Sequence, residues 1–149
     1  MTRRDGGFSR RGGLRWGVAA VSATIVCGCE RAGPQVQMVK GRLLVDGEEV
    51  GGVTVMFTPV DDKGMAAVGR TNAEGVFQLT ARRGHQFGAG TTVGRYKVTI
   101  SKQVLVDERT GRMEETMPYR FMKLEQTPLD CDVTADVNAP EFNVISKPR

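Results

Sequence analysis

The sequence is poor in the residues from which catalytic and metal sites are usually built. It contains one histidine, His85, one tryptophan, Trp16, and three cysteines among 149 residues. A zinc site of three histidines is therefore impossible, and His85 lies in a polar, glycine-containing stretch that is typical of a solvated loop. No G-x-S-x-G elbow, P-loop or dinucleotide fingerprint occurs. We therefore expect a protein that is not an enzyme and that holds no metal and no cofactor.

The sequence also lacks an apolar run long enough to cross a membrane. Its longest one, from Trp16 to Val26, has 11 residues, whereas a bilayer about 30 Å thick needs roughly 20. Five arginines and one aspartate precede this run. A basic segment followed by a short apolar one is typical of a secretory signal, so residues 1–28 are predicted to be a signal peptide that is removed on export.

The four residues that close this segment, Val26-Cys27-Gly28-Cys29, resemble the lipobox of bacterial lipoproteins. The resemblance implies cleavage between Gly28 and Cys29 and attachment of a diacylglyceryl group, with acyl chains such as palmitate, to the Cys29 sulfur. Two or more acyl chains hold a protein stably on a membrane, whereas one holds it only marginally. The chain is then expected on the cell membrane or the outer membrane, with its domain in the periplasm or outside the cell.

Two alternatives remain open for this leader. The apolar run could stay as a short uncleaved anchor, with the Cys27–Cys29 pair fortuitous. The stretch from Ser9 to Arg15 also resembles a twin-arginine export signal, although Gly13 stands where a large apolar residue is usual. A generic basic segment explains the arginines equally well, so the export route stays undecided.

The rest of the chain has no excess of charge of either sign. Five of the 21 basic residues and one of the 17 acidic residues precede Cys29, so 16 of each remain after it. A neutral domain lacks the positive surface that binds phosphate backbones, which argues against a nucleic-acid partner. Cys131 is the only cysteine beyond Cys29, so no internal disulfide is expected, and a small buried apolar role is favoured over a reactive thiol.

From Val39 onward, apolar and polar residues alternate with a period of two in short runs, the pattern of strands buried on one face. Turn signals such as Asp46-Gly47 and Asn72-Ala73-Glu74-Gly75 separate the runs. We expect about seven short strands and no amphipathic helix, and hence an all-β sandwich over residues 38–149 behind a tether at 29–37. The inward positions would be Gly41, Leu43, Val45, Val53, Val55, Phe57, Phe77, Leu79, Tyr96, Val98, Ile100, Leu129, Cys131, Val133, Phe142 and Val144.

The stretch from Val104 to Gln126 does not fit this pattern. It is long, charged and without clear periodicity, and a structureless loop of that length is unusual inside a compact domain. It either holds an edge strand or lies across the sandwich. The apolar residues that would attach it are Met117, Tyr119, Phe121 and Leu124.

Several segments together resemble small bacterial lipoproteins with a carboxypeptidase-regulatory-like, or transthyretin-like, domain. They are Val39-Lys40-Gly41-Arg42, Val50 to Pro59, Gly69 to Leu79, Gly94-Arg95-Tyr96-Lys97-Val98, Met117-Pro118 and Phe142-Asn143-Val144. The resemblance implies a seven-stranded Greek-key sandwich and no catalytic activity. Asn72 stands where the family usually has Asp, and Phe121 stands where a Tyr is common, so a hydroxyl bond made there in relatives is absent.

Gly94-Arg95-Tyr96 also resembles a tyrosine corner, in which the Tyr hydroxyl bonds backbone a few residues upstream. We therefore predict a structural role for Tyr96. Two acidic groups, Asp61-Asp62 and Asp130/Asp132/Asp136, suggest calcium, but their spacing matches no EF-hand and the solvated-face interpretation is favoured.

The expected function is that of a membrane-anchored module in the cell envelope that contacts another envelope protein or wall material. The alternative is a glycan- or small-ligand-binding module. That alternative needs exposed aromatic platforms. Trp16 is lost with the signal and Phe57, Phe77, Tyr96 and Phe142 fall on core positions, which leaves Phe87, Tyr119 and Phe121 as candidates. Clustering of these three rings on one surface would favour binding.

Overall fold

The computed structural model describes residues 35–83 and 86–146. This part of the chain consists of short β-strands and one helical turn, so the prediction of an all-β domain is confirmed. The predicted signal at 1–28, Cys29, most of the 29–37 tether and His85 lie outside the described residues. The elements are β1 (Val36–Gln37), β2 (Lys40–Val45), β3 (Glu48–Glu49), β4 (Thr54–Pro59), β5 (Ala67–Arg70), β6 (Val76–Gln78), β7 (Thr80–Arg83), β8 (Gln86–Ala89), β9 (Thr91–Thr92), β10 (Gly94–Ser101), β11 (Gln103–Asp107), β12 (Arg112–Glu115), α1 (Tyr119–Met122), β13 (Asp130–Val133) and β14 (Glu141–Val144).

The larger sheet has six antiparallel strands in the order β13-β10-β4-β5-β7-β8. Its longest strand, β10, places Val98 opposite Phe57 of β4 and Tyr96 opposite Cys131 of β13. The alternation read from the sequence fixes this register, because a shift of one residue would turn the inward side chains outward. Tyr96, Val98 and Ile100 accordingly face the interior and are each no more than 1% exposed.

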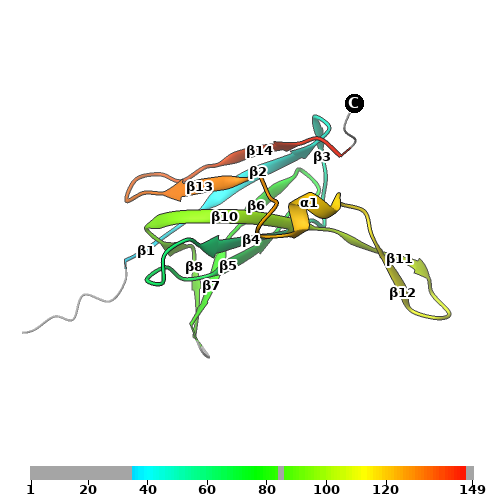
Figure 1. Ribbon diagram of the computed structural model, residues 1–149, viewed down its shortest axis with the longest axis horizontal. Helices are drawn as coiled ribbons and strands as arrows, with labels where there is room; N and C mark the ends of the chain where they lie inside the picture. Colours follow the sequence, from blue (N-terminus) through cyan, green and yellow to red (C-terminus); the bar gives the residue numbers. More distant parts are fainter. Residues whose placement is uncertain (1–34, 84–85, 147–149) are drawn as a thin grey trace, which may run out of the picture. The chain divides into compact units, whose positions relative to one another are not determined.

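The smaller sheet contains β14, β2, β3 and β6, with β2 in its centre. β2 pairs antiparallel with β3 and β6, and parallel with β14, where Leu43 lies opposite Phe142. The last strand of the domain therefore lies beside one of its first strands. Figure 1 shows β14 and β2 running together along one layer, with β10 and β4 in the other.

Four aromatic rings join the two sheets. Phe57 of the larger sheet lies 6.3 Å from Phe77 and 6.2 Å from Phe142 of the smaller sheet, and 5.9 Å from Tyr96, measured between ring centres. Phe77 and Phe142 are stacked at 6.3 Å. Tilted and offset arrangements at these distances are favourable for aromatic pairs. The predicted core positions that these rings occupy are thus confirmed, and the interior is a layer between two sheets.

The predicted strand around Phe77 and Leu79 is in fact two strands in different sheets. β6 pairs with β2, whereas β7, which begins one residue after Leu79, pairs with β5. Leu79 is fully buried between them, and its N–H donates to the carbonyl of Val39 at 3.0 Å. A period-two pattern continues through such a crossover, so the sequence could not reveal it.

Two predicted turns are formed. Asp46 and Gly47 both have positive φ, 54° and 83°, as a two-residue type I′ hairpin requires between β2 and β3. In the second turn, Gly75 has a φ of 70°, and the Asn72 side-chain oxygen accepts hydrogen bonds from the N–H groups of Glu74 and Val76 at 3.0 and 2.9 Å. The Asn72 side chain thus stabilises the turn that the sequence predicts here.

The stretch from 104 to 126 was expected either to hold an edge strand or to lie across the sandwich. It holds a hairpin and a helical turn. β11 pairs antiparallel with β12, and Leu105 lies opposite Met113. α1 packs beside β10 and buries only Phe121. Met117 and Phe121 attach this stretch to the core, whereas Tyr119 and Leu124 are exposed.

Candidate functional site

The predicted lipid-attachment site cannot be placed in the fold. Gly28 and Cys29 lie outside the described residues, and the same holds for His85. The first described residue, Gln35, follows Cys29 by six positions. Within the described residues, no helix is both long and apolar enough to cross a membrane.

The predicted aromatic surface needs a correction at Phe121. Phe87 and Tyr119 are 69% and 61% exposed, but Phe121 is only 3% exposed because it is the inward residue of α1. Its N–H donates to the carbonyl of Pro118 at 3.0 Å, which turns the side chain toward the core. Phe121 therefore packs as a core residue and offers no platform to a ligand.

The two exposed rings do not share a surface patch. Phe87 belongs to the edge strand β8, whereas Tyr119 belongs to α1, which packs beside β10. Three strands, β4, β5 and β7, separate β10 from β8. Each ring also has a cation over one face, Arg82 at 5.4 Å from Phe87 and Lys123 at 5.0 Å from Tyr119. These residues therefore make no common binding site.

Tyr96 forms the predicted tyrosine corner. Its hydroxyl donates to the carbonyl of Thr92, four residues upstream, at 2.8 Å. The same oxygen lies 2.7 Å from the Thr92 hydroxyl and accepts from the Thr91 hydroxyl at 3.1 Å. The Thr91 hydroxyl also donates to the Met65 carbonyl at 2.6 Å, which ties the loop after β4 to β9, just before β10. The structural role predicted for Tyr96 is confirmed by these hydrogen bonds.

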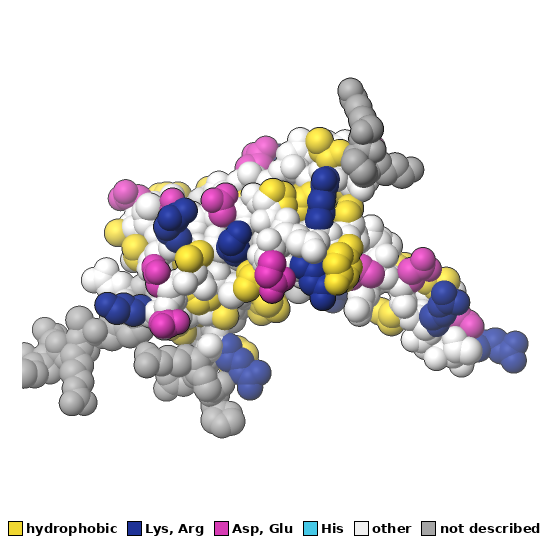
Figure 2. Space-filling view, in the orientation of Figure 1, with side chains coloured by type: hydrophobic (Ala, Val, Ile, Leu, Met, Phe, Trp, Pro, Cys, Tyr) yellow, Lys and Arg dark blue, Asp and Glu magenta, His cyan; other side chains and the backbone are white. Residues whose placement is uncertain are grey.

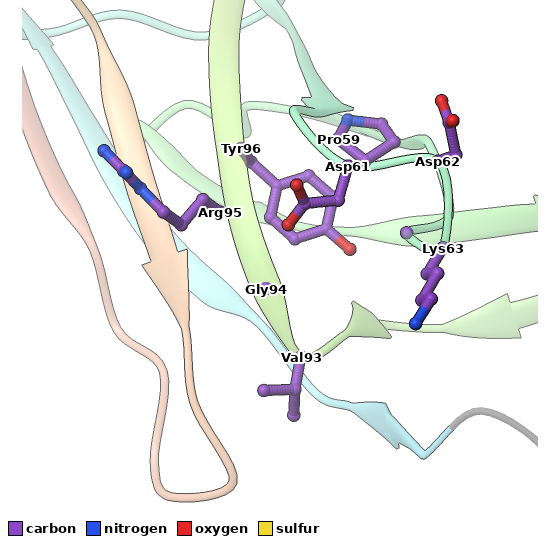
Figure 3. A pocket seen from close by; sticks show the side chains of 9 residues that line it. Pro59, Asp61, Asp62, Lys63, Val93, Gly94, Arg95 and Tyr96 are labelled. Carbon is purple, nitrogen blue, oxygen red and sulfur yellow. The ribbon is translucent and has the colours of Figure 1, made fainter.

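A cavity of about 470 Å³ lies beside this corner (Figure 3). The loop after β4 and the start of β10 form it, and it is lined by Pro59, Asp61, Asp62, Lys63, Gly64, Val93, Gly94, Arg95 and Tyr96. Arg95 points away from the loop (Figure 3) and pairs with Asp132 at 3.5 Å. Asp61, Asp62 and Lys63 are exposed, so their charges are well solvated.

This cavity has the chemistry of a solvated cleft. The Tyr96 hydroxyl is already occupied by hydrogen bonds to Thr91 and Thr92. Within residues 35–83 and 86–146, no group of three or more His, Cys, Asp or Glu side chains is arranged to hold a metal ion. The predicted solvated character of Asp130 and Asp132 agrees with their exposure on β13.

Cys131 is a half-buried thiol that packs against the core. Burial raises its pKa to about 11, with Asp132 and Asp130 adding to the shift. The thiol is therefore protonated at neutral pH, and the thiolate is the form that reacts. This environment favours the predicted packing role over that of a nucleophile.

The β11–β12 hairpin is the part of the described surface that sequence reasoning missed. Val104, Leu105, Val106 and Met113 are between 41% and 55% exposed. Within the described residues, β11 and β12 pair only with each other, so the outer edge of each strand is open. Consecutive apolar residues become exposed in this way only where a two-stranded ribbon has solvent on both faces.

The root of the hairpin is held by hydrogen bonds to the end of β10. Glu115 Oε1 accepts from the N–H groups of Lys102 and Met117 at 2.6 and 3.0 Å. The Thr116 N–H donates to the Lys102 carbonyl at 2.9 Å. These bonds fix the hairpin where it leaves the sandwich, so its apolar side chains are presented from a defined base.

The tip of the hairpin is polar. Asp107 Oδ2 accepts from the Thr110 hydroxyl at 2.8 Å and Oδ1 from the Arg109 N–H at 2.9 Å. These two bonds lower the pKa of the Asp107 carboxyl, and Gly111 completes the turn with a φ of 67°. Figure 2 shows basic, acidic and apolar side chains close together on this arm. Thr110-Gly111 between Val104-Leu105-Val106 and Met113 was the available sequence signal for a hairpin.

Comparisons with known protein families, with curated proteins and with solved structures found no match to this chain.

Proposed function

We propose that this chain is an exported bacterial lipoprotein whose β-sandwich serves as a non-enzymatic interaction module in the cell envelope. Residues 1–28 act as its signal peptide, and Cys29 carries the acyl chains that hold it on a membrane. The sandwich is of the Greek-key, transthyretin-like type found in carboxypeptidase-regulatory-like domains. Most of the segments that support this assignment lie in strands of the two sheets, namely β2, β4, β5, β6, β10 and β14, and Met117-Pro118 precedes α1.

The β11–β12 hairpin is the observation that favours an interaction role. Open strand edges and exposed apolar side chains are hazards that soluble proteins usually avoid, because they pair with other chains. Here the hairpin that carries them is fixed at its base by the hydrogen bonds that Glu115 accepts from Lys102 and Met117. Strand addition by a partner would satisfy the open edge and cover Val104 and Val106 at once.

A crosslinking experiment in intact cells tests the interaction role. A photo-reactive residue is placed at Val106 of the hairpin and, as a matched control, at Val68 of β5, which is 42% exposed on the outer face of the larger sheet. We expect a discrete crosslinked protein from position 106 and none from position 68. Equal, diffuse crosslinking from both positions would contradict the proposal.

A partition experiment tests the anchor separately. The wild-type chain is expected in the detergent phase, because its acyl chains dissolve there, and the Cys29→Ser variant is expected in the aqueous phase. Mass spectrometry of the N-terminal peptide would identify the acyl groups. Equal partition of the two chains would contradict the anchor while leaving the crosslinking result intact.

A further inference from the structure

The end of the sandwich that lies nearest to Cys29 in sequence exposes three apolar side chains on neighbouring segments. Val36 of β1 is 43% exposed, Met38 is 62% exposed and Val137 is 93% exposed. We call these three residues the terminal patch. Met38 lies beside Val137 because Val39 bridges Asn138 in parallel register, and Val36 precedes Met38 by two residues. Met38 and Val137 line one shallow cavity together with Lys40 and Asp136.

Val137 is held outward by a braced loop. The Asn138 side chain accepts from the Thr134 N–H at 2.9 Å and donates to the carbonyls of Thr134 and Asp136 at 2.9 and 2.8 Å. Asn138 itself is only 9% exposed. The polar backbone groups of this turn are therefore largely satisfied internally. Such a turn can lose its water at an apolar interface without leaving these groups unpaired.

The terminal patch is close in sequence to the predicted lipid-attachment residue, which limits which surfaces it can contact. Val36 follows Cys29 by seven residues, and seven residues reach at most about 25 Å in any conformation. A chain anchored at Cys29 therefore keeps Val36 within about 25 Å of the membrane surface. The opposite end of the sandwich, where the hairpin begins, is separated from this end by the full length of β10, eight residues or about 25 Å.

We propose that the terminal patch contacts the lipid surface to which Cys29 is anchored and so orients the domain, with the β11–β12 hairpin directed away from the membrane. This inference rests on the proposed lipid anchor and deepens it. Val137 and Met38 enter the boundary between headgroups and acyl chains, where apolar side chains on an interfacial element are stabilised. Three side chains are too few to hold the protein alone, so the contact forms only in the tethered chain.

The charges around the patch are balanced. Lys40 and Asp136 line its cavity, and Lys63, Arg95, Asp61 and Asp62 line the cavity beside Tyr96, near the same end of β10. The contact is therefore apolar in origin. It is expected on zwitterionic vesicles and should be insensitive to salt, unlike a polybasic contact with anionic lipids.

The test uses the acylated full-length protein in a Cys131→Ala background, reconstituted into phosphatidylcholine vesicles. An environment-sensitive fluorophore is attached to a single new thiol made by Val137→Cys, Met38→Cys or Val106→Cys. All three sites are exposed in the free domain, and position 106 controls for the affinity of the fluorophore for lipid. We expect severalfold brighter emission at 137 and 38 on reconstitution, quenching there by spin-labelled lipid, and no change at 106.

Each other outcome overturns the inference. A label at 137 that stays as water-exposed as one at 106, on protein that floats with the vesicles, refutes the terminal patch and leaves the anchor standing. Protein that does not float with the vesicles refutes the anchor and the orientation together. Shielding at 137 that appears without vesicles and grows with protein concentration assigns the patch to a second copy of the chain instead.

Discussion

At one end of β10 the Tyr96 hydroxyl is enclosed by the Thr91 and Thr92 hydroxyls and the Thr92 carbonyl, whereas just beyond the other end the hairpin leaves four apolar side chains in water. Both regions are hydrogen-bonded at their roots. The difference lies in what their side chains contact, the core in one case and solvent in the other. The hairpin is therefore hydrogen-bonded at its base without being buried, although burial of one face is what normally stabilises a two-stranded β-ribbon.

The largest effect is expected from Phe57→Ala, which removes the ring that joins the two sheets. Phe57 is fully buried and contacts Phe77, Tyr96 and Phe142. We expect a loss of about 3–5 kcal/mol in the free energy of unfolding, because truncation of a buried Phe leaves a cavity. Urea unfolding monitored by circular dichroism measures it. A loss no greater than that of Val106→Ala in the hairpin would contradict the expected difference in burial between the two regions.

The next largest effect is expected on the rate at which the Cys131 thiol is alkylated. The pKa of Cys131 is raised to about 11 from an ordinary value of 9.0, chiefly by burial. At pH 8 its thiolate fraction is lower by about 100-fold than that of an ordinary thiol. We expect alkylation of Cys131 to be slower by at least that factor than alkylation of a thiol made by Val106→Cys in a Cys131→Ala chain. Equal rates would contradict the difference between sandwich and hairpin.

The same pKa shift predicts the sign of a pH effect on stability. The folded state holds the Cys131 proton up to about pH 11, whereas the unfolded chain releases it near pH 9. The free energy of unfolding should therefore fall as the pH rises from about 9 to about 11. The Cys131→Ala variant should lack this part of the decline in thermal melts across that range. An identical alkaline decline in both chains would disprove the linkage.

A smaller effect is expected from Tyr96→Phe. The substitution keeps the ring in the core and removes only the hydroxyl that bonds the Thr92 carbonyl. The expected cost is about 1 kcal/mol in the free energy of unfolding, the net worth of one hydrogen bond. An unchanged unfolding midpoint would show that the corner adds nothing to stability. Tyr119→Phe, at an exposed ring, is the matched control.

The smallest effect on stability is expected in the hairpin. Val106→Ser changes a side chain that is 55% exposed, so the free energy of unfolding should change by less than about 0.5 kcal/mol. If the hairpin binds a partner, the same substitution should weaken crosslinking from a photo-reactive residue at Met113. Retained crosslinking from Met113 with unchanged stability would show that the Val106 side chain adds nothing to binding.

The sequence predicted those parts of the fold that depend on local alternation and turn chemistry. The strand around Tyr96, the type I′ turn at Asp46-Gly47 and the Asn72 turn follow from period-two burial and from residues that accept positive φ. The inward positions of β10 could be predicted because the strand has one solvent-exposed face and one buried face. The tyrosine corner followed from its resemblance to a known motif and is confirmed by the bond to Thr92.

Other parts depend on partners distant in sequence and could not be predicted. The change of sheet at Leu79 leaves the alternation unbroken, so β6 and β7 read as one strand. The hairpin was not predicted because a two-stranded ribbon exposed to solvent on both faces shows no alternation of apolar and polar residues. Val104-Leu105-Val106 is an example. The sequence left Phe121 open as either an attaching residue or a binding platform, because four helical residues show too little periodicity to reveal an inward face. Cys29 stays a prediction, since it lies outside the described residues.

The parallel pairing of β14 with β2 has a consequence for how the domain forms. Phe142 sits opposite Leu43, and the Ser146 N–H donates to Asp46, a partner 100 residues earlier in the chain. During synthesis, β2 lacks one of its neighbouring strands until residues 141–144 have been made. Closure over so long a stretch is slow, because most of the chain must be ordered before the last contacts form. The smaller sheet can therefore be completed only after residues 141–144 have been made.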